Sequence, residues 1–234
     1  MPDLPDLPKT EIAIIAETNA FRRSEKLGEV KANAELTKAA RAFAEYLATS
    51  GKFAHEADGR QPSDRVKAAG YKFCSVAENL AMFLDSRGFT TERLATVTVE
   101  GWKNSPGHRR NMVAPHVTEI GVGVARAPDK NPKFLSVQLF GRPERLKYQF
   151  KIENRAGASV AYSLHGHSHS IDPRVVVTHT ECNPAEITFE RAGNWLTGIK
   201  LESRFEAKDG AVYSVVKEAD GRIRVGDRGR CAAG

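Results

Sequence analysis

The stretch that decides the fold of this chain is WKNSPGHRRNM, residues 102–112. Ser105 followed by Pro106 is a typical helix start, because Ser accepts from the first free backbone amides and Pro already has the dihedral angle of the first helical position. A helix over about 90–104 is therefore expected to end here, and a second helix to begin. The second helix carries His108 in its first turn, where the positive end of the helix dipole favours a neutral imidazole.

Two longer helices are expected upstream of this break. Residues 10–27 start with Thr10 as N-cap and contain no helix-breaking proline. From residue 36 to 47 apolar residues recur at steps of three and four, and Gly51 stops that helix. The remaining upstream segments are a Pro-rich N-terminal leader (1–9), a short helix (64–69) and an extended stretch (73–83).

Beyond Pro115 the pattern changes from helix to strand. Residues 120–125 and 134–139 alternate around a turn at 129–132, which predicts an antiparallel hairpin. Helices come first and the sheet is completed last, which is the order of an α+β domain rather than of a parallel α/β one. Residues 141–144 break both patterns, so a domain over 10–141 is expected to end there.

The segment 146–234 shows only short β-rich runs, with turns at intervals of roughly ten residues. The runs are 148–152, 160–164, 175–180, 187–189, 196–201, 212–216 and 223–225. This spacing favours a small all-β, sandwich-like second domain.

The three cysteines allow two arrangements. A disulfide between Cys182 and Cys231, with Cys74 left free, uses the even number of cysteines in the second domain. The alternative is three reduced thiols, with Cys74 packed as a small apolar side chain.

Composition excludes some function classes. The chain has 234 residues, 41% hydrophobic and 27% charged, with a formal charge of +6, which is ordinary for a folded globular protein. Residues 1–145 hold 22 Lys and Arg against 18 Asp and Glu, and the rest 13 against 11. The excess forms no basic stripe, so no nucleic-acid partner is expected. No apolar run reaches the about 20 residues that cross a bilayer, so no transmembrane segment is expected either.

Three segments resemble one known family. They are FAH (53–55), AENLA (77–81) and residues 102–112, followed by the strand that starts at Glu119. The pattern is similar to that of the CAP superfamily, the cysteine-rich secretory, antigen 5 and pathogenesis-related proteins, and most of all to its bacterial branch with SCP-like domains. The resemblance covers about 10–141. It implies an α-β-α sandwich whose central cleft holds two histidines and two acidic residues, which bind a divalent metal, often zinc, in some members.

The resemblance carries three of those four ligands over to this chain: His55, Glu78 and His108. The family's second acidic residue falls on Ser105. Glu100 is not expected to replace it, because at about 100° per residue it lies roughly 140° from Ser105 around a helix. Two imidazoles and one carboxylate still form a known zinc set with one open position. A hydrogen-bonded polar cluster without a metal is the alternative.

Asn79 and Ser105 are also expected to line the cleft. Ser beside two histidines raises the idea of a nucleophile, but as an N-cap its hydroxyl is expected to bond to backbone amides. In the second domain His165, His167 and His169 recur at period two. On a strand they would share a face, where a neighbouring pair could hold a transition metal, and a hairpin tip or exposed loop explains them equally.

The expected function follows from the resemblance. It is that of a secreted or periplasmic envelope protein of non-enzymatic type, with any signal peptide removed from this chain. Its cleft is expected to bind a divalent cation such as zinc, a lipid-like molecule or a segment of a partner, and its β-domain to associate with an envelope, lipid or protein partner. The alternative is a zinc-dependent hydrolase, a peptidase or esterase, that uses the same cleft of His55, Glu78 and His108.

Overall fold

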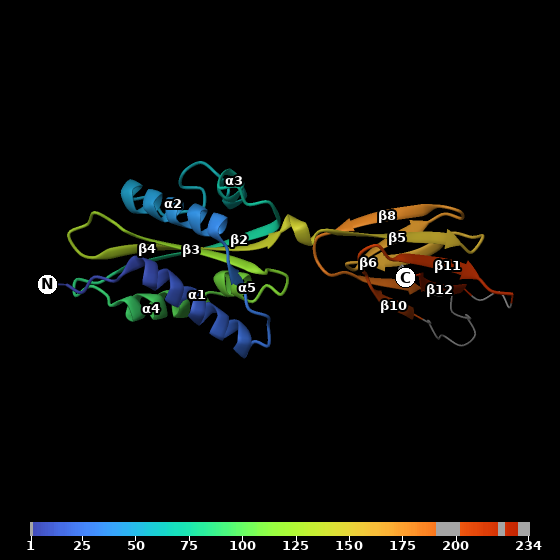
Figure 1. Cartoon of the computed structure of the whole chain (residues 1–234), viewed down its shortest axis with the longest axis horizontal. Coiled ribbons are helices and arrows are strands. Elements are labelled where there is room, and N and C mark those ends of the chain that lie inside the picture. Colours follow the sequence, from blue (N-terminus) through green and yellow to red (C-terminus); the bar gives the residue numbers. More distant parts are fainter. Residues whose placement is uncertain (1, 191–201, 220–222, 229–234) are drawn as a thin grey trace, which may run out of the picture. The chain divides into compact units, whose positions relative to one another are not determined.

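The computed structural model describes residues 2–190, 202–219 and 223–228. The chain divides into two units, Met1–Arg145 and Leu146–Gly234, and each has hydrophobic core residues of its own. Figure 1 shows the course of the chain through both units.

The first unit is a four-stranded sheet covered by helices on both faces. Helices α2 and α3 lie over one face and α1, α4 and α5 over the other (Figure 1). The strand order is β1-β3-β4-β2, with β1 parallel to β3 and the other neighbours antiparallel. The α+β architecture is thus confirmed. Its elements are α1 (Leu7–Ser24), β1 (Lys31–Ala32), α2 (Ala34–Ser50), α3 (Pro62–Ala68), β2 (Phe73–Leu84), α4 (Thr91–Lys103), α5 (Pro106–Met112), β3 (Glu119–Arg126), β4 (Lys133–Pro143) and the 3₁₀ turn η1 (Glu144–Leu146).

Helix α2 packs on the sheet with the predicted apolar stripe. Asn33 caps the helix by accepting from the Leu36 amide at 2.9 Å, and Gly51 ends it in the left-handed conformation. The side chains buried against the sheet are Leu36, Ala39, Ala40, Phe43, Ala44, Leu47 and Ala48. The predicted periodicity is therefore confirmed.

The close approach of α2 to β3 requires two glycines. A Cβ on Gly121 would lie 2.2 Å from the carbonyl carbon of Leu36, and one on Gly123 would lie 2.2 Å from the nitrogen of Arg41. Because these neighbours are backbone atoms, the helix backbone packs directly on the strand.

Helix α1 begins earlier than the sequence predicts. Its N-cap is Asp6, whose carboxylate accepts from the Lys9 amide at 3.0 Å, and Pro8 lies in the first turn. The prediction of Thr10 as N-cap is wrong, since the Thr10 hydroxyl instead donates to the Asp6 carbonyl at 2.9 Å. Residues 7–9 of the expected leader consequently belong to the helix.

The second unit contains two four-stranded sheets that share one core. The sheets have the orders β10-β9-β6-β7 and β12-β11-β5-β8, and the core includes Phe150, Tyr162, Ile187 and Tyr213. Of the predicted runs, 196–201 lies outside the described residues. The strands are β5 (Tyr148–Arg155), β6 (Val160–Leu164), β7 (His167–Ile171), β8 (Val176–Glu181), β9 (Glu186–Glu190), β10 (Glu202–Glu206), β11 (Val212–Lys217) and β12 (Ile223–Arg228).

The cysteine arrangement differs from the prediction. Cys74 and Cys182 are both disulfide-bonded, so both predicted arrangements, the one with a free Cys74 and the one with three reduced thiols, are wrong. Cys231, the predicted partner of Cys182, lies outside the described residues. The even number of cysteines in the second domain favoured a pair within that domain, whereas disulfides depend on three-dimensional proximity.

None of the helices in the described part of the chain is both long and apolar enough to cross a bilayer.

Candidate functional site

The centre of the candidate site is a contact between His55 and Glu78. His55 lies in the loop after α2, and Glu78 lies in β2, paired with Leu139 of β4. The imidazole Nδ1 is 2.9 Å from Oε1 of Glu78. The Glu78 side chain is 1% exposed and the His55 side chain 51%. A buried carboxylate thus orients an imidazole that solvent can reach.

Arg65 of α3 completes this pair, and sequence reasoning did not identify it. Its Nη2 donates to both oxygens of Glu78, at 2.9 Å from Oε1 and 2.8 Å from Oε2. The same nitrogen donates to the carbonyl of His55 at 2.9 Å. The Arg65 side chain is buried, so the loop, helix α3 and strand β2 meet at one guanidinium.

His108 lies in the first turn of α5 and is half-buried. Burial lowers the pKa of its imidazole, and the nearby His55 lowers it further. The structure therefore brings the two predicted histidines within electrostatic reach of each other.

Helix α5 is held on β2 by amide side chains. Asn79 donates to the carbonyl of His108 at 3.1 Å, and Asn111 donates to the side-chain oxygen of Asn79 at 2.8 Å and to the carbonyl of Glu78 at 3.2 Å. Asn79 is fully buried. This expected cleft residue therefore acts from beneath the site, as the residue that positions His108.

A buried polar chain continues from Asn79 across the sheet. Asn79 donates to Oε1 of Gln138 at 3.0 Å, and Nε2 of Gln138 donates to the Thr18 hydroxyl at 2.9 Å. Thr18 in turn donates to the carbonyl of Ile14 at 2.7 Å. Neither Gln138 nor Thr18 was predicted, since an isolated polar residue within an apolar strand or helix gives no sign of its partner.

Ser105, on which the resemblance places the family's fourth ligand, is the N-cap of α5 as predicted. Its side chain makes no capping hydrogen bond, which corrects the expectation that the hydroxyl is engaged with the helix amides. Glu100 forms a surface pair with Lys103 at 2.6 Å. It does not take the place of the missing carboxylate.

The site does not fit the divalent metal that the resemblance implies. In residues 2–190, 202–219 and 223–228, no group of three or more His, Cys, Asp or Glu side chains is arranged to hold a metal. Glu78, the one acidic ligand, already accepts from Arg65 with both oxygens. The carboxylate is therefore neutralised by a guanidinium.

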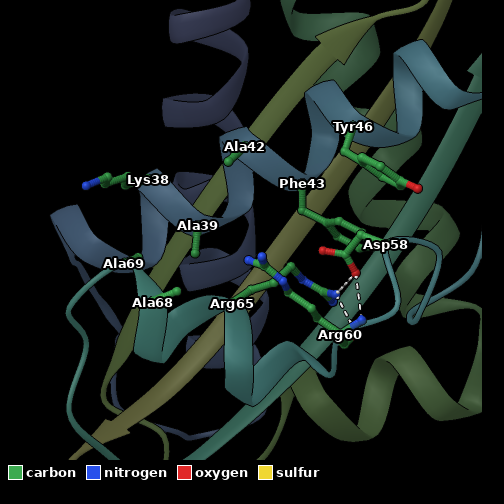
Figure 2. Close-up of a pocket in the computed structure, with 10 residues that line it drawn as sticks. All are labelled: Lys38, Ala39, Ala42, Phe43, Tyr46, Asp58, Arg60, Arg65, Ala68 and Ala69. Carbon is green, nitrogen blue, oxygen red and sulfur yellow. Dashed lines mark hydrogen bonds and ion pairs between the residues drawn. The ribbon is translucent and has the colours of Figure 1, made fainter.

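A pocket of about 470 Å³ lies between α2 and α3, and Arg65 is one of its lining residues. Figure 2 shows Arg65 and Asp58 joined at its edge, where Nη1 of Arg65 donates to Asp58 at 2.9 Å. Its lining combines small or aromatic side chains with charged ones, and none of the expected cleft residues belongs to it. The lining residues are Lys38, Ala39, Ala42, Phe43, Tyr46, Asp58, Arg60, Arg65, Ala68 and Ala69.

The histidines of the second unit occupy a hairpin and its strand. His165 and Gly166 both have positive φ and form the two-residue turn between β6 and β7, as expected for a type I′ turn. His169 lies on β7 and its ring stacks on Tyr162, with centroids 5.1 Å apart. His179 of β8 is 2.9 Å from the Tyr162 hydroxyl through Nε2. The strand and hairpin-tip interpretations are thus both partly correct.

Comparison with known proteins covers the first unit. A family model described as CAP, the cysteine-rich secretory protein family, matches residues 15–140. The uncharacterized protein YkwD of Bacillus subtilis is 31% identical over 114 residues, which is 48% of this chain and 41% of YkwD. The match thus spans about two fifths of that relative.

Two solved structures are each similar to more than half of this chain. An outer surface protein from Borrelia burgdorferi has a TM-score of 0.50 and 22% identity, over 58% of this chain and 93% of that chain. An extracellular protein containing an SCP domain from Bacillus anthracis has a TM-score of 0.48 and 23% identity, over 58% of this chain and 41% of that chain.

Proposed function

This chain belongs to the cysteine-rich secretory protein (CAP) family, in its bacterial branch, and on that premise we propose that it is a non-enzymatic secreted or envelope protein whose cleft binds a ligand. The cleft is formed by His55, Glu78 and His108. The β-domain, which lies outside the family match, serves association with an envelope, lipid or protein partner.

The observation that carries the ligand role is the contact of His55 with Glu78. A buried carboxylate that fixes one nitrogen of a half-exposed imidazole leaves the other nitrogen available to a ligand. His108 adds a second imidazole, and the buried Asn79 donates to the backbone carbonyl of His108. Rigid support beneath accessible polar groups is the usual construction of a binding site.

Export from the cytoplasm is supported by the cysteines. Cys74 and Cys182 are disulfide-bonded, and structural disulfides persist in oxidising compartments and are rare in the cytosol. This agrees with a location outside the cytoplasm, such as the periplasm or the cell exterior.

The hydrolase alternative has less support. A zinc hydrolase needs a metal that activates water, and Glu78 is committed to Arg65.

The ligand role is tested by titrating the full chain, labelled with ¹³C at histidine Cε1, with two probes. One is N-acetylglucosamine tetrasaccharide, a neutral envelope-type sugar, and the other is sodium palmitate, a lipid-like anion. We expect one probe to shift the signals of both His55 and His108 and to raise the melting temperature. The His55→Ala/His108→Ala variant is expected to lose that rise. The proposal fails if neither probe shifts these signals, or if the double variant responds as the parent does.

A further inference from the structure

We infer that Arg65 is the resident cation of the cleft, which excludes a divalent metal from Glu78 and leaves the site to ligands that present a neutral hydrogen-bond donor to His55. This inference rests on the proposed function, because it states which chemistry that same cleft accepts.

The two carboxylate oxygens of Glu78 already have hydrogen-bond partners. A carboxylate offers about four lone-pair positions, and both oxygens of Glu78 are already engaged. Nη2 of Arg65 lies within hydrogen-bond distance of each oxygen, and Nδ1 of His55 contacts Oε1. A carboxylate oxygen that binds zinc lies about 2.0–2.2 Å from the ion. A zinc ion bound to Glu78 would have to displace Arg65 or approach a guanidinium of like charge.

Both terminal nitrogens of the Arg65 guanidinium are held by hydrogen bonds. Its Nη1 donates to Oδ1 of Asp58 at 2.9 Å and to the carbonyl of Arg60 at 2.8 Å. Its guanidinium carbon lies 3.5 Å from the ring centroid of Phe43, and its side chain is 6% exposed. Displacement would break these contacts together.

The guanidinium of Arg65 cannot lose its charge by deprotonation. A lysine in this position could lose its proton and admit a metal, whereas a guanidinium stays protonated in proteins. Ser105 replaces the acidic residue that would otherwise balance an incoming cation. The positive charge of the cleft is therefore that of the Arg65 side chain rather than of a metal ion.

The group that is left for a ligand is Nε2 of His55. Nδ1 of His55 lies 2.9 Å from Oε1 of Glu78. An ionised carboxylate only accepts, so Nδ1 carries the proton in this contact and the neutral form of the imidazole has its lone pair on Nε2. That atom accepts from a hydroxyl or an amide N–H. A sugar or a peptide backbone offers such donors.

The experiment is a zinc chloride titration of the full chain at pH 7.5, read at the Cε1–Hε1 signals of His55 and His108. These signals report on the cleft alone, whatever the histidines of the β-domain do. In the parent protein we expect neither signal to shift at one equivalent of zinc. In Arg65→Met, which keeps the length and removes the charge, both are expected to shift together and the melting temperature to rise. Arg65→Met/Glu78→Gln is expected to lose both effects.

The matched control is Arg109→Met in α5. Arg109 is an exposed arginine close to His108 in sequence that pairs with Glu25 at 2.9 Å, so the variant removes a positive charge without changing Glu78. It is expected to behave as the parent does.

Two results would overturn the inference: a joint shift of both signals in the parent, or no zinc response in a folded Arg65→Met. Arg65→Gln is the second variant if Arg65→Met does not fold. If neither variant folds, the zinc titration of the parent protein decides, because a joint shift of both signals there overturns the inference. In the probe titration, a response to palmitate but not to the tetrasaccharide would leave the ligand role standing and refute the donor preference. A response to neither probe would refute the ligand role, while the zinc result would still be read independently.

Discussion

Arg65 and Glu78 form a two-point ion pair in the interior of the first unit, with Nη2 of the arginine 2.9 Å and 2.8 Å from the two carboxylate oxygens. The two side chains are 6% and 1% exposed. Without solvent around it, the Glu78 carboxylate depends on the guanidinium for compensation of its charge. The pair therefore joins α3 to β2 and fixes the carboxylate that contacts the imidazole of His55.

Removal of one partner is expected to destabilise the first unit strongly. Arg65→Ala leaves the buried Glu78 carboxylate without its cation, so the free energy of unfolding should fall by about 3 to 5 kcal/mol. Urea unfolding followed by circular dichroism measures the change. Arg109→Ala breaks the exposed pair with Glu25 and should cost about 0 to 1 kcal/mol. An equal loss in both variants would contradict the buried pair's importance.

The stability of the first unit is expected to fall in acid because of His108. Burial and the neighbouring His55 lower the pKa of His108 in the folded state, so the unfolded chain binds more protons below the reference pKa of about 6.5. Stability is then unaffected by this group above that pH. It is lost progressively as the pH falls through 6.5 toward the lower pKa of the folded state.

Two measurements check this direction. The decrease in unfolding free energy between pH 7.5 and pH 5 should be smaller in His108→Gln than in the parent. In an NMR titration, His55→Ala should raise the pKa of His108, since His55 contributes to lowering it. A pKa of His108 that falls in His55→Ala would show that the two imidazoles are not coupled as described.

Much of the first unit was predictable because local patterns decided it. The stripe of α2 and the Ser105–Pro106 helix start depend on residues within a few positions of one another. The start of α1 was misplaced because Thr10 and Asp6 are both good N-caps, and only the structure shows that Asp6 bonds to the Lys9 amide. A sequence pattern does not decide between two nearby residues that are both good N-caps.

The site was predictable only in part. His55, Glu78 and His108 came from the resemblance to a family. Arg65 lies in the segment Asp64-Arg65-Val66-Lys67, which is typical of the solvated face of a short helix. It is buried because Phe43 and Glu78, distant in the sequence, meet it in space. Partners of this kind leave no trace in local periodicity.

Alanine at either glycine of β3 is expected to disrupt the first unit. A Cβ at Gly121 or Gly123 would overlap the backbone of α2 at 2.2 Å, and backbone cannot rotate away as a side chain can. We expect losses of about 3 kcal/mol or more in unfolding free energy. Gly28→Ala is the control, because nothing lies within 4 Å of its added Cβ. Similar melting temperatures for all three variants would contradict the close packing.

The disulfide state of Cys74 and Cys182 is expected to be visible by mass spectrometry. Both are bonded, so protein denatured without reductant and treated with iodoacetamide should carry no modification at either cysteine. The same treatment after reduction should modify both. Alkylation of Cys74 before reduction would instead support the arrangement with a free Cys74.

In the second unit, the pKa of His179 is expected to respond in opposite directions to its two neighbours. Burial, which includes stacking on Phe150 with ring centroids 5.1 Å apart, is the main cause of its lowered pKa, and His169 lowers it further while Glu181 raises it. His169→Ala should therefore raise the pKa of His179, and Glu181→Gln should lower it. NMR titration of the ring signals measures both, with Thr180→Ala as control, since Thr180 lies on the opposite face of β8 and carries no charge. Because the folded pKa lies below about 6.5, protonation opposes folding, and the second unit should lose stability as the pH falls through that value. A shift of the same sign in both charge variants would refute this arrangement of groups around His179.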